Sequence, residues 1–179
     1  GDNIMAAGVN RFYFHSGESQ PGTDDKKPGL TWNYGIFQNR NNTWYQTGKD
    51  YFSYLARCEA LLQQGRFVGD ILAFEGDQGS GRESLYDPPT GYASDETDSD
   101  LLVQSVSVDH GQVSLPDGEH YSILALANSD SIALPVLEKV AALVRAGAVV
   151  WGPKPVHALG MTGYPDSQAA LTKLADSLW

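Results

Sequence analysis

The chain has 179 residues, of which 41% are apolar and 11% aromatic, so it can fill a real hydrophobic core. Its 22 acidic and 12 basic residues give a formal net charge of -10, which argues against nucleic acid and anionic membrane surfaces as partners. Cys58 is the single cysteine, so no disulfide can form within the chain, and the cellular compartment stays open.

The first predicted element is a strand over residues 7 to 16, a run rich in Val, Phe and Tyr with almost no turn residues inside it. Such a run is typical of a strand buried on both faces, as strands of parallel sheets are. Its polar tail, His15, Ser16 and Glu18, would emerge at the carboxyl end of the strand, where open α/β sheets and barrels carry their chemistry. An ordinary core strand followed by a solvated loop fits the same pattern.

Residues 17 to 50 are predicted to form a long ordered loop, because Gly and Pro break its periodicity while its aromatic residues are too numerous for a disordered linker. Loops of this length usually bind or cover something. The aromatic rings alternate with amide and guanidinium groups such as Asn39 and Arg40, a combination that suits sugars, since a ring can lie on the apolar face of a pyranose. Aromatic side chains that close the end of a core are the alternative.

A helix is predicted over residues 50 to 64, with Gly65 as its C′ residue. Its apolar stripe at helical spacing consists of Tyr51, Tyr54, Leu55, Cys58 and Leu62. Because Cys58 belongs to that stripe, we expect a buried, inert thiol.

Residues 66 to 179 alternate predicted strands and helices in the manner of a doubly wound, flavodoxin-like parallel sheet. The predicted elements are a strand at 67–74, a helix near 98–105, a hairpin at 106–108 and 112–115 around the turn Asp109-His110-Gly111, a turn at Pro116-Asp117-Gly118, a strand at 121–127, a helix that begins at Pro135 and ends before Gly147, a strand at 148–151, and a last helix with Asp166 as N-cap. Glu75 and Asp77 follow the first of these strands, and a loop runs on to about Thr97.

Several cofactor motifs are missing from the sequence. It has no GxGxxG at a strand-to-helix turn and no GxxxxGK[ST], which argues against dinucleotides, nucleotides and a flavin, so we expect no cofactor. A catalytic Cys on a strand-to-helix elbow, as a glutamine amidotransferase requires, is missing too, because Cys58 lies in mid-helix. His15, His110, His120 and His157 lie far apart in the sequence, so we expect no zinc or other metal site in this chain.

Seven short segments, taken in order, resemble glycoside hydrolase family 106, the α-L-rhamnosidases. They are Gly8-Val9-Asn10-Arg11-Phe12, Phe14-His15, Asn39-Arg40-Asn41-Asn42-Thr43-Trp44, Tyr54-Leu55-Ala56-Arg57-Cys58, Leu61-Leu62-Gln63-Gln64-Gly65, Asp70 and Gly152-Pro153-Lys154-Pro155. The likeness spans nearly the whole chain. It implies a fold in which a fragment of an (α/β)8 barrel, residues 1–65, precedes a flavodoxin-like (Rossmann-like) α/β domain, residues 66–179.

The resemblance also implies a reaction, the hydrolysis of terminal α-L-rhamnosides of plant or microbial polysaccharides and glycosides with inversion at the anomeric carbon. Inversion requires one carboxylic acid to protonate the leaving oxygen and an opposing carboxylate to activate water. The resemblance implies that these acids, and carboxylates that hold a calcium ion, lie on barrel strands outside this chain. The chain itself would then carry no catalytic residue, no cofactor and no metal, and would be inactive alone.

What the resemblance leaves to this chain is part of the sugar-binding rim, namely His15, Arg40 and Trp44, with Asn10 and Arg11 structural. The expected partner is the carbohydrate substrate. A complete barrel of this type takes about 250 residues, so residues 1–65 cannot close one, and residues 1–50 are expected to be rearranged, poorly ordered or paired with another chain, which would give a homo-oligomer through the exposed strand.

Two other functions compete with the rhamnosidase hypothesis. One is a non-catalytic carbohydrate-binding or interaction module, in which the aromatic loop binds sugar. The other is an independent small hydrolase that uses Glu18, Glu75 and Asp77, which we disfavour because acidic residues in loops are usually just solvated.

Overall fold

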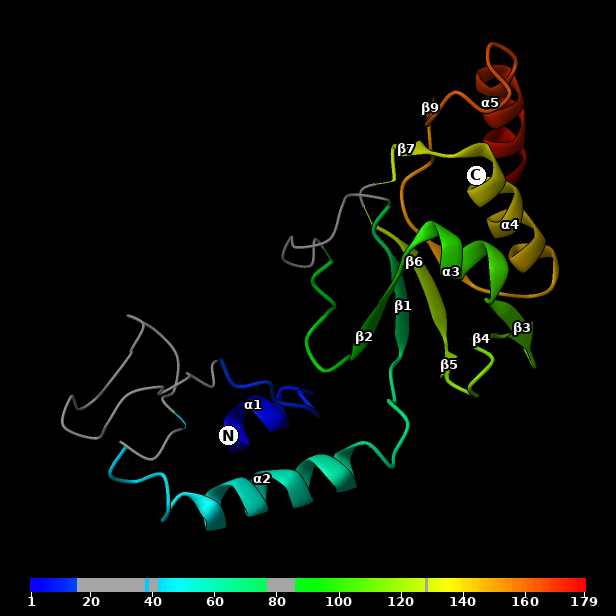
Figure 1. Ribbon diagram of the computed structural model, residues 1–179. Helices are drawn as coiled ribbons and strands as arrows, with labels where there is room; N and C mark the ends of the chain where they lie inside the picture. Colours follow the sequence, from blue (N-terminus) through cyan, green and yellow to red (C-terminus); the bar gives the residue numbers. More distant parts are fainter. Residues whose placement is uncertain (16–37, 39–41, 77–85, 128) are drawn as a thin grey trace. The chain divides into compact units, whose positions relative to one another are not determined.

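The computed structural model describes residues 1–15, 38, 42–76, 86–127 and 129–179. The chain divides into two compact units, residues 1–66 and residues 67–179, which Figure 1 draws with their helices and strands labelled. No helix in the described ranges is long and apolar enough to cross a membrane.

The described part of unit 1 contains two helices, α1 (Asp2–Ala6) and α2 (Lys49–Leu62). The predicted helix at 50–64 is thus confirmed, although its C-cap is Gln63, which puts Gly65 one residue beyond the expected C′ position. Leu55 is the one buried residue of α2. The expectation of a buried thiol was wrong, because Cys58 is only half-buried.

The strand predicted at residues 7 to 16 is absent from residues 7–15, which the structure describes as irregular and mostly exposed. A strand is defined by hydrogen bonds to a neighbouring strand, and the described part of unit 1 offers only helices. Side chains two positions apart nevertheless lie together: the Phe12 and Phe14 rings stack with centroids 6.4 Å apart, and the Arg11 guanidinium lies 5.1 Å from the centroid of the Tyr13 ring. Such alternation is typical of an extended strand.

The core of unit 2 is a parallel four-stranded sheet with the order β2-β1-β6-β8. Its strands are β1 (Ile71–Phe74), β2 (Ser94–Thr97), β6 (Ile123–Leu126) and β8 (Val150–Trp151). Each residue of β1 is buried and pairs on both sides, for example Leu72 with Asp95 and with Leu124. The predicted strands at 67–74, 121–127 and 148–151 are confirmed in part.

The differences lie mainly at the strand starts. Phe67 and Val68 are 46% and 87% exposed and precede the sheet, which begins after Asp70. Tyr121 belongs to a separate antiparallel strand rather than to the central one. β2 was missed altogether, because its sequence Ser-Asp-Glu-Thr is polar. An edge strand can be polar, since it pairs on one side only.

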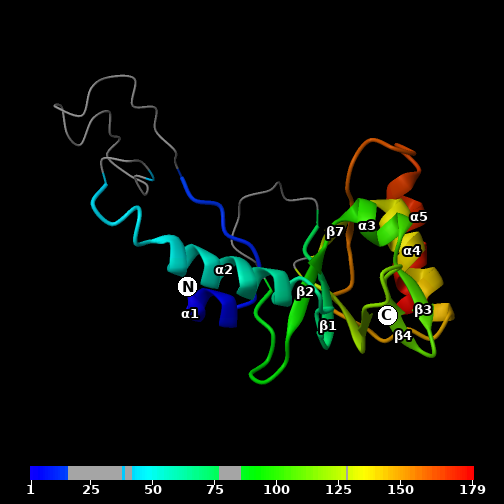
Figure 2. The ribbon, with the colours of Figure 1, turned by 60° about the horizontal axis from the view of Figure 1, so that its bottom comes forward.

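Three helices pack with this sheet: α3 (Ser99–Gln104), α4 (Leu134–Arg145) and α5 (Ser167–Leu178). All three were predicted. The Asp98 side chain caps α3 by accepting a hydrogen bond from the Leu101 N–H, and Gly147 follows α4 with a φ of 105°. Asp166 is the N-cap of α5, but its side chain makes no capping hydrogen bond. Figures 1 and 2 both show α4 and α5 side by side on the same side of the sheet.

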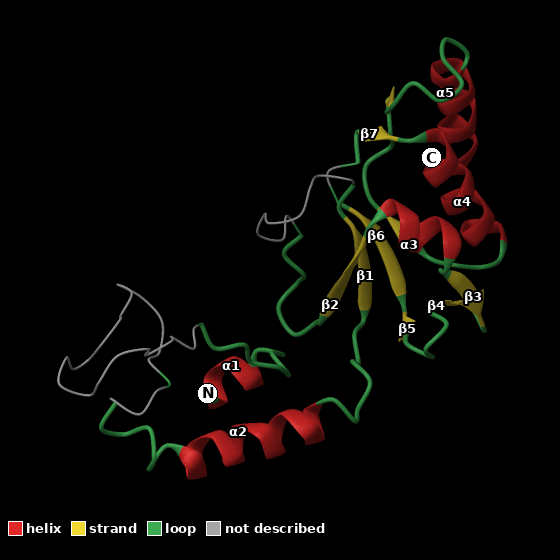
Figure 3. Cartoon of the chain, viewed as in Figure 1, coloured by secondary structure: helices red, strands yellow, loops and turns green. Residues whose placement is uncertain are grey.

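Two small sheets complete unit 2, as Figure 3 shows by colour. The antiparallel one contains β3 (Ser107–Asp109), β4 (Gln112–Ser114) and β5 (His120–Tyr121), and it confirms the predicted hairpin. His110 and Gly111 have φ angles of 48° and 81°, as the tight turn requires. β7 (Ser131–Ile132) and β9 (His157–Ala158) pair in parallel, and we did not predict them.

Candidate functional site

The predicted sugar-binding residues His15 and Trp44 lie in unit 1, on segments joined by an aromatic cluster. Phe14, which precedes His15, packs edge-on against Phe52 of α2, with ring centroids 5.4 Å apart. Trp44 packs against the same Phe52 ring, with centroids 6.4 Å apart. One aromatic side chain of α2 therefore contacts both the segment that carries His15 and the turn that carries Trp44.

The turn before α2 holds Trp44 by its backbone. The Trp44 N–H donates to Asn42 Oδ1 at 3.2 Å, and the Trp44 carbonyl accepts from Thr47 Oγ1 at 3.0 Å and from the Gly48 N–H at 2.8 Å. Gly48 is the small residue this packing needs, because a Cβ there would lie 3.2 Å from ring atoms of both Trp44 and Phe52. The indole is 42% exposed, so one part of it is anchored and another part is free to contact a ligand.

Arg40, the third predicted rim residue, lies outside the described residues, as do Glu18 and Asp77. His15 lies within them and is exposed. The contacts through Phe52 therefore connect two of the three predicted residues to one cluster, and the sugar-binding role of all three stays a prediction.

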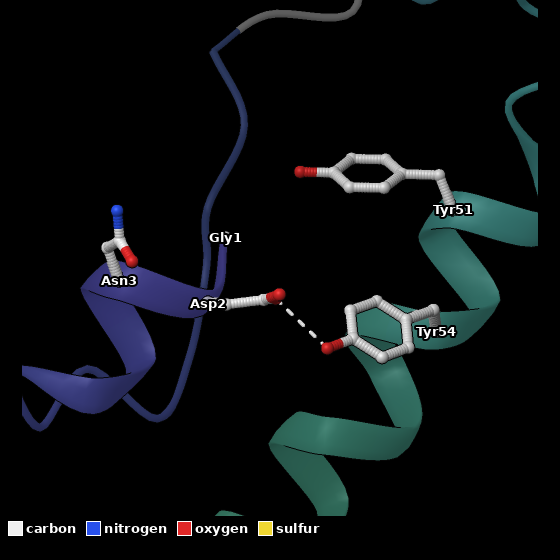
Figure 4. A pocket seen from close by; sticks show the side chains of 5 residues that line it. All are labelled: Gly1, Asp2, Asn3, Tyr51 and Tyr54. Carbon is white, nitrogen blue, oxygen red and sulfur yellow. Dashed lines mark hydrogen bonds between the residues drawn. The ribbon is translucent and has the colours of Figure 1, made fainter.

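A hollow of about 480 Å³ lies beside this cluster, between α1 and α2. It is lined by Gly1, Asp2, Asn3, Tyr51 and Tyr54, which Figure 4 shows. The Tyr54 hydroxyl donates a hydrogen bond to Asp2 Oδ1 at 2.9 Å. This contact ties the short helix α1 to α2.

The same hydrogen bond changes the acidity of the phenol. The Asp2 carboxylate, followed by the thiol of Cys58, raises the pKa of Tyr54 to about 12, because both groups stabilise the protonated phenol. Tyr54 is thus a neutral hydrogen-bond donor at physiological pH. Its hydroxyl connects α1 and α2 through the hydrogen bond to Asp2. A phenol that stays protonated cannot act as a general base.

A second hollow, of about 370 Å³, continues along the apolar side of α2. Its lining includes Met5 of α1 together with Cys58, Leu61 and Leu62 of α2. Leu61 and Leu62 are exposed, so the apolar stripe that predicted the helix is uncovered over much of its length.

Glu75 follows β1, at the carboxyl end of the parallel sheet of unit 2. Its Oε1 accepts a hydrogen bond from the Tyr86 N–H at 2.6 Å, across the loop that begins after β1. Ser129, which follows β6, is buried and donates to the Ala127 carbonyl at 3.0 Å. Both of these polar groups form hydrogen bonds with the backbone of nearby loop residues.

The remaining histidines do not form a cluster. His110 Nδ1 lies 2.7 Å from Asp109 Oδ1 on the exposed hairpin turn, and His120 and His157 are exposed on other strands. Within the described residues, no group of three or more His, Cys, Asp and Glu side chains could hold a metal ion.

The sequence analysis missed two features of unit 1. Phe52 lies off the predicted apolar stripe, and its role as the shared contact of Phe14 and Trp44 depends on a segment about forty residues away in the chain. Tyr51 and Tyr54 were assigned to the apolar stripe of the predicted helix, and the structure shows that they line an open hollow. The uneven spacing of aromatic residues along α2 is the one signal that could have indicated a second face.

Comparison with known proteins gives three results. The α-L-rhamnosidase family of glycoside hydrolases, family 106, matches residues 1–179. A protein of Formosa agariphila whose name proposes a β-glucuronidase is 37% identical over 182 residues, which cover 100% of this chain and 15% of that protein. The structure of a rhamnosidase from Novosphingobium sp. PP1Y superposes with a TM-score of 0.77 at 32% identity, over 88% of this chain and 16% of that one. The chain thus spans less than a fifth of the length of either relative.

Proposed function

Because the chain belongs to glycoside hydrolase family 106, the α-L-rhamnosidases, we propose that it supplies part of the sugar-binding rim of an enzyme that hydrolyses terminal α-L-rhamnosides with inversion. The match of the family over all 179 residues carries this proposal. The likeness to a rhamnosidase structure, with a TM-score of 0.77, supports it.

In this proposal unit 1 is the last strand, loop and helix of an (α/β)8 barrel, and unit 2 is the flavodoxin-like domain that follows it. The order β2-β1-β6-β8 supports the second assignment. When only the four strands of this sheet are numbered along the chain, the order becomes 2-1-3-4, which is the flavodoxin-like order without its last strand.

The contribution of this chain is to bind and orient the sugar. The exposed part of the Trp44 indole stacks on the apolar face of the pyranose ring, while His15 and Arg40 form hydrogen bonds with its hydroxyls. Phe52 fixes the positions of Trp44 and of the segment before His15. A sugar held in this way keeps its anomeric carbon in one orientation, which an in-line attack by water requires.

The acid and the base come from parts of the enzyme outside this chain. In inverting glycosidases the two carboxyl groups stand about 6.5–9.5 Å apart, with room for water between them. Glu75 accepts a backbone hydrogen bond from Tyr86 and follows a strand of unit 2, so we assign it to the structure of its loop. This argues against the small-hydrolase alternative.

The calcium ion that the family resemblance implies finds no site in the described residues. Calcium takes about six to eight oxygen ligands, mainly from carboxylates and carbonyls. In those ranges no three His, Cys, Asp or Glu side chains gather, so these residues do not fit the ion and no step above uses it.

The name of the Formosa agariphila relative gives a second candidate, hydrolysis of β-glucuronides. Besides its different ring configuration, a glucuronide carries a carboxylate where a rhamnoside has a methyl group, and an arginine binds a carboxylate well through two parallel hydrogen bonds. Arg40 would then contact the carboxylate rather than a hydroxyl. The two candidates share the Trp44 stacking surface and differ in the sugar that it accepts.

The test compares two chromogenic substrates on the natural polypeptide that carries this sequence. We expect release of nitrophenol from 4-nitrophenyl α-L-rhamnopyranoside and none from 4-nitrophenyl β-D-glucuronide, with β-L-rhamnose as the first product by proton NMR. Hydrolysis of the glucuronide alone would establish the second candidate. Turnover of neither substrate would contradict both.

Trp44→Ala should raise KM for the rhamnoside about fivefold with little change in kcat, because a lost stacking contact costs roughly 1 kcal/mol of binding. Tyr92→Phe, an exposed position in unit 2, is the matched control and should leave both constants unchanged. If the natural polypeptide binds L-rhamnose, as a change in tryptophan fluorescence, but turns over neither substrate, the non-catalytic binding module becomes the better description of the chain.

A further inference from the structure

The side chains of residues 11–14 alternate between two sides of an extended segment. The Phe12 and Phe14 rings stack with their centroids 6.4 Å apart, and the Arg11 guanidinium lies 5.1 Å from the centroid of the Tyr13 ring. In an extended chain, side chains two positions apart lie on the same side, and neighbouring side chains lie on opposite sides. One side of the segment therefore carries Phe12 and Phe14, and the other carries Arg11 and Tyr13.

Contacts with α2 show which of these two sides faces the helix. The Phe14 ring packs edge-on against Phe52 of α2, with ring centroids 5.4 Å apart. The backbone of the segment is held against the same helix, because the Phe12 N–H donates a hydrogen bond to Glu59 Oε1 at 3.0 Å. The side with the two phenylalanines therefore faces α2, and the opposite side of the segment faces away from this helix.

In the proposed barrel, the side that faces away from the helix is the inner one. The helices of an (α/β)8 barrel form its outer ring, so a strand side chain that points away from them points into the barrel. The inward side chains nearest the carboxyl end of the strand surround the active site. Tyr13 precedes His15 by two positions, which is about 7 Å along an extended chain. The barrel thus places Tyr13 on its inner side, one step below the predicted rim.

The surroundings of Tyr13 suit a side chain that contacts a sugar. The Arg11 guanidinium lies over the Tyr13 ring, and the attraction between a cation and an aromatic face restricts the orientation of that ring. Tyr13 is nevertheless 81% exposed, so its ring can present its other face to a ligand. The apolar side of a pyranose packs well on such a face, and the hydroxyl at the edge of the ring can bond to a sugar hydroxyl.

We propose that Tyr13 contacts the sugar as an aromatic wall below His15, and that Arg11 positions its ring. The structural role expected of Arg11 is then to fix the orientation of this one side chain. The inference rests on the proposed function, because it requires the barrel and a sugar substrate. A tyrosine that only fills the barrel core is the competing explanation. Such a residue would contribute to stability rather than to substrate binding.

Kinetics of the natural polypeptide on 4-nitrophenyl α-L-rhamnopyranoside separate these two explanations. Tyr13→Ala should raise KM about fivefold with little change in kcat or in melting temperature, whereas Tyr13→Phe, which keeps the ring, should stay within about twofold of the parent. Tyr92→Ala, at an exposed tyrosine of unit 2, is the matched control and should leave KM unchanged. An unchanged KM in Tyr13→Ala, with or without a lower melting temperature, would overturn the inference.

Variants of Arg11 test its positioning role in the same assay. Arg11→Ala should raise KM about twofold to threefold, because the ring loses its fixed orientation, and Arg11→Lys, which keeps a cation beside the ring, should restore most of the parent value. In a chain that already carries Tyr13→Ala, Arg11→Ala should have no further effect, since Arg11 acts through the ring. Equal effects of Arg11→Ala with and without the Tyr13 ring would overturn this role.

Nitration by tetranitromethane gives a test that requires neither a variant nor turnover, because the reagent modifies accessible tyrosine rings and peptide mass spectrometry locates them. In L-rhamnose at ten times its Kd only about a tenth of the sites stay free, so nitration of Tyr13 should slow about tenfold while that of Tyr92 stays unchanged. Unchanged nitration of Tyr13 in an enzyme that hydrolyses the rhamnoside would overturn the inference and leave the proposed function intact. Slowed nitration without hydrolysis would support the sugar contact and contradict the proposed reaction.

Discussion

Residues 9–14 of unit 1 and β6 of unit 2 both lie in segments that were predicted as buried strands, residues 7–16 and 121–127, yet only β6 is part of a sheet. β6 pairs with β1 on one side and with β8 on the other, and its residues Leu124, Ala125 and Leu126 are fully buried. In residues 9–14 the Phe12 N–H donates to Glu59 Oε1 of α2 and the Asn10 carbonyl accepts from Gln63 Nε2, and within the described residues no strand pairs with the segment.

The difference shows that an apolar pattern makes a segment able to form a strand. The segment becomes one only where neighbouring strands are available to pair with it. The partners of β6 lie within 60 residues of it along the chain, and each brings its own apolar side chains to the shared core. Those of residues 9–14 are missing from the described part of unit 1. The same hydrophobic side chains therefore contribute to a core in unit 2 and remain largely exposed in unit 1.

Shortening a buried side chain of the parallel sheet should have the largest effect on stability. Leu124→Ala removes a fully buried side chain from the centre of the sheet, and we expect it to lower the free energy of unfolding of unit 2 by about 2–5 kcal/mol. Val9→Ala, at a position that is 38% exposed, should cost less than about 0.5 kcal/mol. Urea denaturation followed by circular dichroism measures both. Equal effects of the two substitutions would mean that the comparison between the segments is wrong.

A tighter test concerns the close approach of the chain after β8 to β6. Gly152 has a φ of 153°, and a Cβ there would lie 2.6 Å from the Leu126 carbonyl oxygen. Gly152→Ala should therefore destabilise unit 2 by about 1–3 kcal/mol more than Gly160→Ala, which changes another glycine with positive φ but open surroundings. Melting temperatures of the two variants and the parent chain give the comparison. Similar values for both variants would show that strain at positive φ alone accounts for the loss.

The contribution of a polar contact to the stability of unit 2 can be tested at Tyr121. Its buried hydroxyl lies 3.0 Å from Asp95 Oδ2 and 3.1 Å from Glu119 Oε2, so it connects the edge strand β2 with the start of β5. Tyr121→Phe leaves both carboxylates without this donor, and we expect it to cost about 1–3 kcal/mol in the unfolding of unit 2. Tyr92→Phe, at an exposed tyrosine, should cost almost nothing and serves as its control.

The environment of Tyr121 also predicts that the stability of unit 2 depends on pH. Burial, followed by the negative charges of Asp95 and Glu119, raises the pKa of Tyr121 in the folded chain. The unfolded chain then loses its proton first, near the ordinary tyrosine pKa of about 10, so the stabilisation is complete below that pH and falls as pH rises above it. Unfolding by urea at pH 9 to 11 should show a steeper loss of stability for the parent chain than for Tyr121→Phe. Parallel curves would contradict the assignment of this loss to Tyr121.

The elements that the sequence predicted correctly are those whose signals are local. The caps of α3 and α4, the His110-Gly111 turn and the apolar run of β1 each depend on a few neighbouring residues. β2 could not be predicted in this way, because a polar edge strand exists only through the backbone of its neighbour. β7 and β9 are two residues each and pair over a separation of 26 positions, which leaves almost no local pattern.

For the candidate site, residue types could be predicted but not their arrangement. The aromatic and amide composition of the loop singled out Trp44, and the end of a predicted strand singled out His15. Nothing local indicated that Phe52 would connect them, since that contact joins segments far apart in sequence. Asp2 and Tyr54 were not paired in advance for the same reason, because 52 positions separate them.

The smallest predicted effect concerns that pair, and it tests whether α1 belongs to unit 1 in solution. If the Asp2 carboxylate accepts a hydrogen bond from the Tyr54 hydroxyl in solution, Asp2→Ala should lower the pKa of Tyr54 from about 12 toward the ordinary value of about 10, because the largest cause of the shift is removed. Cys58→Ala should lower it less, since the thiol is the second cause. Asn3→Ala, which changes another residue of the same hollow, should leave the pKa of Tyr54 unchanged.

NMR titration of tyrosine labelled at Cζ measures the pKa of Tyr54 in the parent chain and in all three variants. A Tyr54 signal that titrates identically in the parent chain and in Asp2→Ala would show that α1 separates from α2 in solution, so that residues 9–14 contact α2 without help from the Asp2–Tyr54 hydrogen bond.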